Sequence, residues 1–238
     1  MPIIRNRNFS ESYFWLKVEN VGYFITFEGV EGCGKTTQIK LLSDFLSARN
    51  IQAVLTREPG GCPIADKIRA ILLDAENRDL SPLAELMLYG AARAQHVTEV
   101  IAPALSGGKI VLCDRFCDAT VAYQSFGRGI DRDVIDSLNH HACQGVSPDL
   151  TVLFDCDPRV GLERALRRIE ASSGPREERF DLEALAFHER VRAGYLQLAS
   201  DQPGRFFVVN GADTIENIFS AISRQVLLRI PENLHAVC

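Results

Sequence analysis

Five short runs of apolar, β-branched and aromatic residues recur along the chain, separated by longer stretches with helical periodicity. The runs cover residues 23–27, 53–56, 109–113, 150–154 and 205–209, and each has the length of a buried strand. Strands that alternate with helices favour parallel pairing, because each helix carries the chain back across the sheet. The pattern therefore predicts an α/β fold: a doubly wound, five-stranded parallel sheet with helices on both faces.

Local sequence signals set the expected ends of several helices. Ser-Pro at 81–82 predicts an N-cap and a first turn for a long helix over 82–102. Asp-Pro at 157–158 opens a helix in the same way, and Asp181 is expected to cap a helix that ends near residue 199. The other helices are expected directly after the loop that follows the first strand, and over 63–73, 131–143 and 213–228. The polar and aromatic segment 118–129 is expected to lie outside these elements.

The chain of 238 residues is predicted to form one domain over 21–230. Residues 1–20 are expected to be an extension outside the core fold, because they lack the continuous apolar run of a signal peptide and contain two glutamates. Residues 231–238 are expected to be a C-terminal tail. No apolar run approaches the roughly 18 residues of a membrane span, so no membrane partner is expected.

Charge and cysteine usage narrow the class further. The net charge of −5 argues against a nucleic-acid-coating surface, which requires a basic stripe. The seven cysteines are scattered and contain no C-x-x-C pair, so neither a zinc site nor a disulfide framework is predicted. This usage indicates a reducing, cytoplasmic location.

The loop after the first strand carries the clearest chemical signal. Gly29, Gly34, Lys35 and Thr36 occupy every fixed position of the phosphate-loop pattern G-x-x-x-x-G-K-[ST]. Glycines allow backbone N–H groups to turn inward around an anion, and the following helix directs its positive end to the same point. The sequence predicts an ATP site made of Gly29, Val30, Glu31, Gly32, Cys33, Gly34, Lys35, Thr36 and Thr37.

Two oxygen-bearing side chains are expected to bind Mg²⁺ beside this loop. The Thr36 hydroxyl follows the phosphate-loop lysine, and Asp114 ends the apolar strand at 109–113. An acid at the end of such a strand is typical of the magnesium side of a phosphate-loop enzyme. ATP and Mg²⁺ are therefore the predicted cofactors.

Several other features have both a functional and a structural interpretation. Arg57 ends the second strand, where open α/β sheets bind ligands. Tyr89, Arg93 and His96 share one helix face, and the spacing alone favours ordinary surface packing as its explanation. Five arginines over 164–179 fit a solvated loop or an arginine-bearing lid at about 168–180.

Taken together, the motifs resemble the thymidylate kinase family in its bacterial form, over nearly the whole of 23–230. The resemblance rests on G-V-E-G-C-G-K-T-T in the phosphate loop, an R-E-P-G-G segment, a tyrosine four residues before an arginine, D-R-F, A-Y-Q-x-x-G-R and E-R-F-D. These motifs cover residues 29–37, 57–61, 89–93, 114–116, 122–128 and 178–181, respectively.

This resemblance implies ATP-dependent phosphorylation of dTMP to dTDP, by a dTMP kinase with the phosphate-loop nucleotide kinase fold. Tyr89 would stack on thymine, Arg93 would hold the base, and Thr120 and Gln124 would lie at its edge. The remaining implied dTMP contacts are Glu31, Arg57, Arg115 and Tyr123. The implied catalytic residues are Lys35, Asp114, Arg115 and the lid residue Arg179, with Arg167, Arg168 and Arg176 as weaker lid candidates. Family members are usually homodimers, which implies a second copy as partner.

Other functions stay open at this point. A different pyrimidine nucleoside or nucleotide kinase would share most of these motifs. A nucleotide-dependent switch is a further alternative, although the chain contains no N-K-x-D guanine-reading motif. Cys33 also has two interpretations: a reactive thiol that bound ATP protects, or an inert small residue in the phosphate loop.

Overall fold

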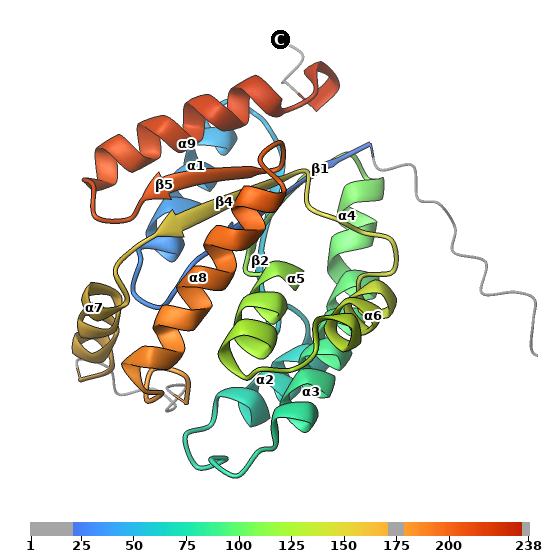
Figure 1. Ribbon diagram of the computed structural model, residues 1–238. Helices are drawn as coiled ribbons and strands as arrows, with labels where there is room; N and C mark the ends of the chain where they lie inside the picture. Colours follow the sequence, from blue (N-terminus) through green and yellow to red (C-terminus); the bar gives the residue numbers. More distant parts are fainter. Residues whose placement is uncertain (1–20, 171–178, 235–238) are drawn as a thin grey trace, which may run out of the picture.

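Five parallel strands form the centre of the computed structural model, which describes residues 21–170 and 179–234. The strands are β1 (Tyr23–Glu28), β2 (Ala53–Arg57), β3 (Ile110–Asp114), β4 (Leu150–Asp155) and β5 (Phe206–Asn210). Their order across the sheet is β2-β3-β1-β4-β5, and every neighbouring pair runs parallel. The predicted doubly wound, five-stranded parallel sheet is confirmed (Figure 1).

Helices cover both faces of this sheet (Figure 1). One face is covered by α1 (Lys35–Ser47) and α9 (Ile215–Arg229). The other is covered by α4 (Ala102–Ser106), α5 (Cys117–Thr120), the π-helical turns η1 (Val97–Ile101) and η2 (Val121–Gly127), and α8 (Leu185–Asp201). Outside these lie α2 (Pro63–Leu73), α3 (Pro82–His96), α6 (Arg132–Cys143), α7 (Pro158–Glu170) and the short η3 (Glu232–Leu234).

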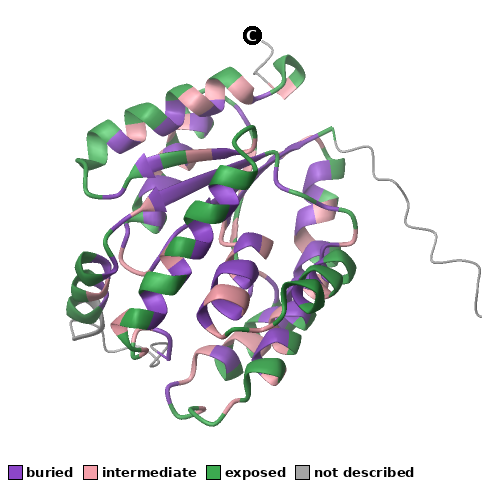
Figure 2. Ribbon diagram, viewed as in Figure 1, coloured by how far each residue is buried: buried purple, intermediate pink, exposed green. Residues whose placement is uncertain are grey.

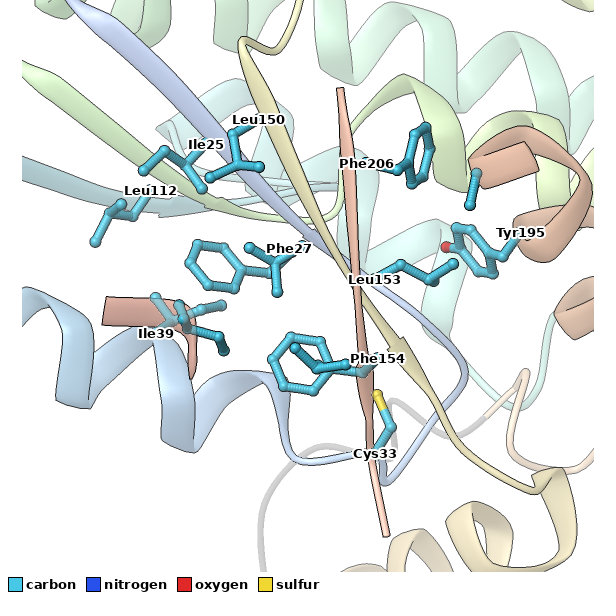
Figure 3. Close-up of a cluster of buried hydrophobic side chains, with 14 of the residues drawn as sticks. Ile25, Phe27, Cys33, Ile39, Leu112, Leu150, Leu153, Phe154, Tyr195 and Phe206 are labelled. Atoms are coloured by element: carbon cyan, nitrogen blue, oxygen red, sulfur yellow. The ribbon is translucent and has the colours of Figure 1, made fainter. Parts of the chain in front are cut away.

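Strand side chains alternate between the two faces, as a pleated sheet requires. Figure 3 shows Phe27 beside Ile39 of α1, whereas Phe24 packs edge-on against Phe116 on the opposite face, with ring centroids 4.9 Å apart. Every residue of β1 is buried, as Figure 2 shows along the strand. This burial on both faces explains why β1 has a continuous apolar sequence rather than an alternating one.

Three details differ from the sequence expectation. The long helix over 82–102 continues through η1 and α4 to Ser106. Most of segment 118–129 is helical, in α5 and η2, although its mixture of polar and aromatic residues gave no such signal. Helix α8 begins at Leu185 rather than Asp181, because residues 179–184 form turns whose start is held against α2 by a hydrogen bond from Arg179 N to Leu73 O.

The expected extension at 1–20, the middle of the lid segment and the last four residues lie outside the described residues. Across 21–170 and 179–234, no helix is long and apolar enough to span a membrane.

Candidate active site

The phosphate loop lies between β1 and α1 and contains Lys35 in its interior. Gly34, the N-cap of α1, has a φ of 93°, in the left-handed region that favours glycine. Gly32 approaches α7 so closely that a Cβ would lie 2.0 Å from the Gly161 carbonyl oxygen. The Lys35 ammonium donates to the carbonyl oxygens of Gly29 (3.1 Å) and Val30 (2.9 Å). A buried cation at the positive end of a helix is suited to binding phosphate.

Thr36 and Asp114 meet beside this loop, although 78 residues separate them in sequence. Pairing of β1 with β3 places Phe27 opposite Asp114, so both chain segments leave the sheet at the same edge. The Thr36 hydroxyl donates to Asp114 Oδ2 over 3.2 Å. Among the described residues, no group of three or more acidic, histidine or cysteine side chains surrounds a possible metal. A hydroxyl and one carboxylate fit Mg²⁺ that takes its remaining ligands from substrate phosphates and water.

A cleft opens next to the phosphate loop on the α3, α5 and η2 side of the sheet. Its open space, with the solvent at its mouth included, measures about 730 Å³. Aromatic rings and charged groups line it together. The lining residues are Glu31, Glu58, Pro59, Arg69, Leu73, Tyr89, Arg93, Arg115, Phe116, Ala119, Thr120, Tyr123, Gln124, Phe180 and Asp181.

Arg93 is held in the wall of this cleft by a buried network. Its Nε donates to Glu58 Oε2 (2.8 Å), and its Nη1 donates to Asn139 Oδ1 (2.6 Å). Its Nη2 donates to the Phe116 carbonyl oxygen (3.1 Å) and to Thr120 Oγ1 (2.9 Å). Among the residues that the structure describes, four of its five N–H groups therefore have protein partners, which leaves one hydrogen on Nη1.

Arg115 follows β3 directly and reaches into the cleft from a strained backbone position. Its φ is 69°, which is unusual for a residue with a side chain and is typical of functional sites. Its guanidinium donates to Glu31 Oε1 (2.9 Å) and to the Tyr195 hydroxyl (3.1 Å), and lies 4.8 Å from the centre of the Tyr123 ring. The strain and these contacts fix a cation between the phosphate loop and the cleft.

Glu31 is the acid at the centre of this group. Burial opposes its ionisation, but Arg115, His188 and Lys35 together hold the pKa of Glu31 well below its usual range. The Tyr123 hydroxyl donates to Oε1. His188 Nδ1 lies 3.2 Å from Oε2, close enough for an electrostatic contact but misaligned for a hydrogen bond. Glu31 is therefore a carboxylate at neutral pH.

A second acid, Glu28, lies beneath the site at the end of β1. It accepts hydrogen bonds from Phe116 N (2.7 Å) and the Tyr195 hydroxyl (2.8 Å). Complete burial, reinforced by the charge of Asp118, raises the pKa of Glu28 to about 8. Through these two hydrogen bonds, the Glu28 side chain holds Phe116, which lines the cleft, and Tyr195, which contacts Arg115.

The cleft brings together seven of the eight residues that the resemblance assigns to dTMP. These are Glu31, Tyr89, Arg93, Arg115, Thr120, Tyr123 and Gln124. The eighth, Arg57, is 57% exposed and faces Asp66 at 3.6 Å. Arg69 of α2 lines the cleft instead, and its place could be inferred only once α2 is packed against α3. Glu58, Phe116 and Phe180 were not assigned to the site either, although each lies within one of the quoted motifs.

The lid residues take positions that the sequence did not indicate. Arg179 is buried, and its guanidinium donates to the Leu72 carbonyl oxygen (2.5 Å) and to Glu85 Oε2 (2.7 Å). Neither partner belongs to the phosphate loop. Arg167 is exposed and pairs with Glu163 one helical turn away. Arg176 and the side chain of Arg168 lie outside the described residues.

The Cys33 thiol is part of the hydrophobic core. Only 1% of the residue is exposed, and Figure 3 shows its sulfur beside the ring of Phe154. The Lys35 ammonium lies 3.4 Å from the same sulfur. Because reaction with an external reagent requires access, this burial favours the interpretation of Cys33 as a small filler of the loop.

Comparison with known proteins agrees with this geometry. The family model described as thymidylate kinase matches residues 27–222, which include the phosphate loop and every lining residue of the cleft. The chain belongs to the thymidylate kinase family. The recognised resemblance is therefore confirmed.

Individual members of the family match almost from end to end. The thymidylate kinase of Trichlorobacter lovleyi is 64% identical over 87% of this chain and 98% of its own length. That of Pelobacter propionicus is 62% identical over 91% of this chain and 100% of its own. The crystal structure of thymidylate kinase from Ehrlichia chaffeensis superposes with a TM-score of 0.69, at 35% identity, over 87% of this chain and 98% of that one.

Proposed function

We infer that this chain is an ATP-dependent dTMP kinase, which transfers the γ-phosphoryl group of ATP to the 5′-phosphate of dTMP and releases ADP and dTDP. One observation carries the inference: the phosphate loop and a separate aromatic cleft meet at the end of β3. There Asp114 faces Thr36 of the loop, and the next residue, Arg115, lines the cleft. Two adjoining sites bring two bound nucleotides phosphate to phosphate, which is the main requirement for this reaction.

On the ATP side, the backbone N–H groups from Gly29 to Thr37 are proposed to surround the phosphates. Lys35 would exchange its carbonyl partners, Gly29 and Val30, for β- and γ-phosphate oxygens. Thr36 and Asp114 would hold Mg²⁺, whose charge neutralises the phosphates when it is bound.

On the dTMP side, Tyr89 would stack on the base, and Arg93, Thr120 and Gln124 would meet its polar edge. Tyr123 and Glu31, which are hydrogen-bonded to each other, adjoin the expected place of the sugar. Arg115 would bind the acceptor phosphate, and both Arg57 at the end of β2 and Arg69 in the cleft wall could add charge.

The chemical step needs positioning and charge neutralisation rather than a strong general base. The acceptor oxygen belongs to a phosphate that is already ionised at neutral pH. In-line attack on the γ-phosphorus develops charge on its equatorial oxygens, and cations stabilise that charge. We assign this role to Lys35, Arg115 and an arginine of the lid. If Arg179 is that arginine, it must leave Glu85 during the cycle.

A coupled ADP-release assay with ATP and Mg²⁺ tests the function, with dTMP, dUMP, dCMP, UMP, AMP and GMP as acceptors. Strong preference for dTMP is expected. Turnover of a different monophosphate would support another kinase of this fold and overturn the base-site roles. ADP release without any acceptor would favour a nucleotide-dependent switch.

We also propose that the chain acts as a homodimer. Large apolar side chains are exposed on α2, α3 and α6, which pack side by side. These side chains belong to Ile64, Ile71, Leu83, Met87 and Val134. We propose that they form one apolar patch of the kind that is typical of a protein interface. Size-exclusion chromatography with light scattering should give twice the chain mass, and a monomer at micromolar concentration would contradict the proposal.

A cytoplasmic location is proposed from the cysteines. The six that lie in the described part of the chain are all free thiols, and five of them are buried. Free thiols persist in a reducing compartment. The domain limits of 21–230 also remain a proposal.

A further inference from the structure

Glu85 of α3 is a buried acid that the mechanism above does not use. Its side chain is 1% exposed, yet it accepts hydrogen bonds from three different side chains. Gln124 Nε2 donates to Oε1 (3.0 Å), and Arg179 Nη2 donates to Oε2 (2.7 Å). Arg128 donates from Nε to Oε1 and from Nη2 to Oε2, each over 3.2 Å. Two guanidinium groups thus balance one carboxylate, as a buried charge requires.

The carboxylate determines which end of the Gln124 amide faces the cleft. A carboxylate accepts hydrogen bonds and donates none, so the amide nitrogen of Gln124 must turn toward Glu85. The amide oxygen then points away from Glu85, and Gln124 lines the cleft. Within 21–170 and 179–234, no donor bonds to that oxygen. Gln124 therefore offers the ligand a hydrogen-bond acceptor.

Arg93 makes the Thr120 hydroxyl a hydrogen-bond donor to the cleft, whereas Gln124 offers an acceptor. A guanidinium only donates, so the Thr120 hydroxyl oxygen accepts from Arg93 Nη2 and keeps its own hydrogen for another acceptor. No acceptor for that hydrogen is present in the described part of the chain. Thr120 also lines the cleft and therefore offers the ligand a donor, one helical turn from the acceptor of Gln124.

Both classes of pyrimidine carry a donor beside an acceptor on this edge, so a cleft that turns its acceptor toward N3 and its donor toward position 4 fits only one of them. Thymine and uracil carry an acceptor at O4 and a donor at N3–H, whereas cytosine carries a donor at its 4-amino group and an acceptor at N3. We propose that Glu85 is a specificity-determining positioning residue: it holds the Gln124 amide with its oxygen toward N3 of the base, while the Thr120 hydroxyl faces position 4, so that the cleft accepts 4-keto pyrimidine nucleotides and rejects 4-amino ones. This inference rests on the proposed function for the identity of the ligand class.

The substitution Glu85→Gln tests the proposal. The new amide can present either its nitrogen or its oxygen to Gln124, so the Gln124 amide is free to turn and offer a donor to the cleft. Isothermal titration calorimetry without ATP gives the dissociation constants of dTMP and dCMP. The wild-type protein is expected to bind dTMP at least about 100-fold more tightly, since mispaired buried polar groups are strongly penalised. In Glu85→Gln this ratio is expected to fall roughly tenfold.

Glu183→Gln is the matched control. Glu183 also pairs with Arg128, but it makes no hydrogen bond to Gln124, so its loss of charge should leave the ratio unchanged. An unchanged ratio in Glu85→Gln, or an equal fall in both variants, would overturn the proposal. If circular dichroism shows that Glu85→Gln does not fold, the ratio is measured in the wild-type protein and in Glu85→Asp, which keeps the carboxylate. Equal binding of dTMP and dCMP by the wild-type protein then refutes the inference.

Binding without ATP also separates this proposal from the proposed function. One outcome is that the wild-type protein does not phosphorylate dTMP, yet its preference for dTMP over dCMP in binding depends on Glu85. This result would support the positioning role and refute the kinase reaction. Phosphorylation of dTMP with a ratio that Glu85→Gln leaves unchanged would support the reaction and refute the positioning role.

Discussion

The buried pair of Arg93 and Glu58 offers the sharpest test of the cleft's architecture. Their side chains are 2% and 3% exposed, and the Arg93 Nε lies 2.8 Å from Glu58 Oε2. Glu58 also contacts His96 Nδ1 at 3.1 Å, and His96 in turn lies 2.6 Å from the Thr56 hydroxyl. The variant Glu58→Gln keeps the shape of the side chain but removes the charge opposite Arg93.

The size of the effect follows from burial. Removing one partner of a buried ion pair leaves an uncompensated charge in the interior and costs about 3–5 kcal/mol. The glutamine amide retains one acceptor for Arg93, so we expect the lower end, about 3 kcal/mol. For a domain of this size each kcal/mol lowers Tm by roughly 2–4 °C, so Tm should fall by about 6–12 °C. Affinity for dTMP should fall as well, because Arg93 no longer has a fixed position in the cleft wall.

Thermal unfolding followed by circular dichroism measures the loss, with Asp66→Asn as control. Asp66 also faces an arginine, Arg57, but the two side chains are 47% and 57% exposed and 3.6 Å apart. Exposed pairs contribute only about 0–1 kcal/mol, so the control should lower Tm by about 4 °C at most. Equal Tm changes in the two variants would refute the argument that burial of Arg93 and Glu58 makes their pairing essential.

Three further predictions address the rest of the site. Asp114→Asn should raise the Mg²⁺ concentration needed for half-maximal turnover while dTMP affinity stays constant, because the substitution weakens an oxygen ligand beside Thr36. An unchanged Mg²⁺ dependence in the ADP-release assay would contradict this prediction. Glu28 has a pKa raised to about 8, so the stability it contributes is complete below its usual pKa near 4.5 and is lost as pH rises through 8. Glu28→Gln should therefore gain stability relative to the wild-type protein between pH 5 and 9, and urea unfolding that gives a constant difference would be evidence against a raised pKa. If Arg179 contacts the transferred phosphate, Arg179→Ala should lower turnover much more than dTMP affinity. If Arg179 acts only on Glu85, the substitution should change the ratio of dTMP to dCMP affinity and leave the turnover of dTMP unchanged.

Local sequence patterns were enough to predict the framework of this protein. The phosphate loop and the five strands were predictable because each depends on a short, contiguous pattern: glycines at fixed spacing, or a run of apolar residues that ends at a turn. Parallel pairing followed from the alternation of strands with helices. The placement of Thr36 near Asp114 also followed, since both leave neighbouring parallel strands at the same edge.

Local patterns were less informative where tertiary contacts decide the backbone. Residues 117–127 are helical although their mixed composition gave no period, because α5 and η2 pack against α6 and α8. The turn at 179–184 replaced a predicted helix start because Arg179 and Phe180 are drawn into contact with α2 and the cleft.

The pairing of the buried charges depends on the three-dimensional fold. Glu85 meets Gln124, Arg128 and Arg179 across separations of 39, 43 and 94 residues, and Arg93 meets Glu58 across 35. Sequence periodicity reports neighbours within one or two helical turns, so none of these partners could be read from spacing. The chain therefore specifies by local pattern where phosphate binds, and specifies through long-range packing which hydrogen-bonding groups the cleft presents to a base.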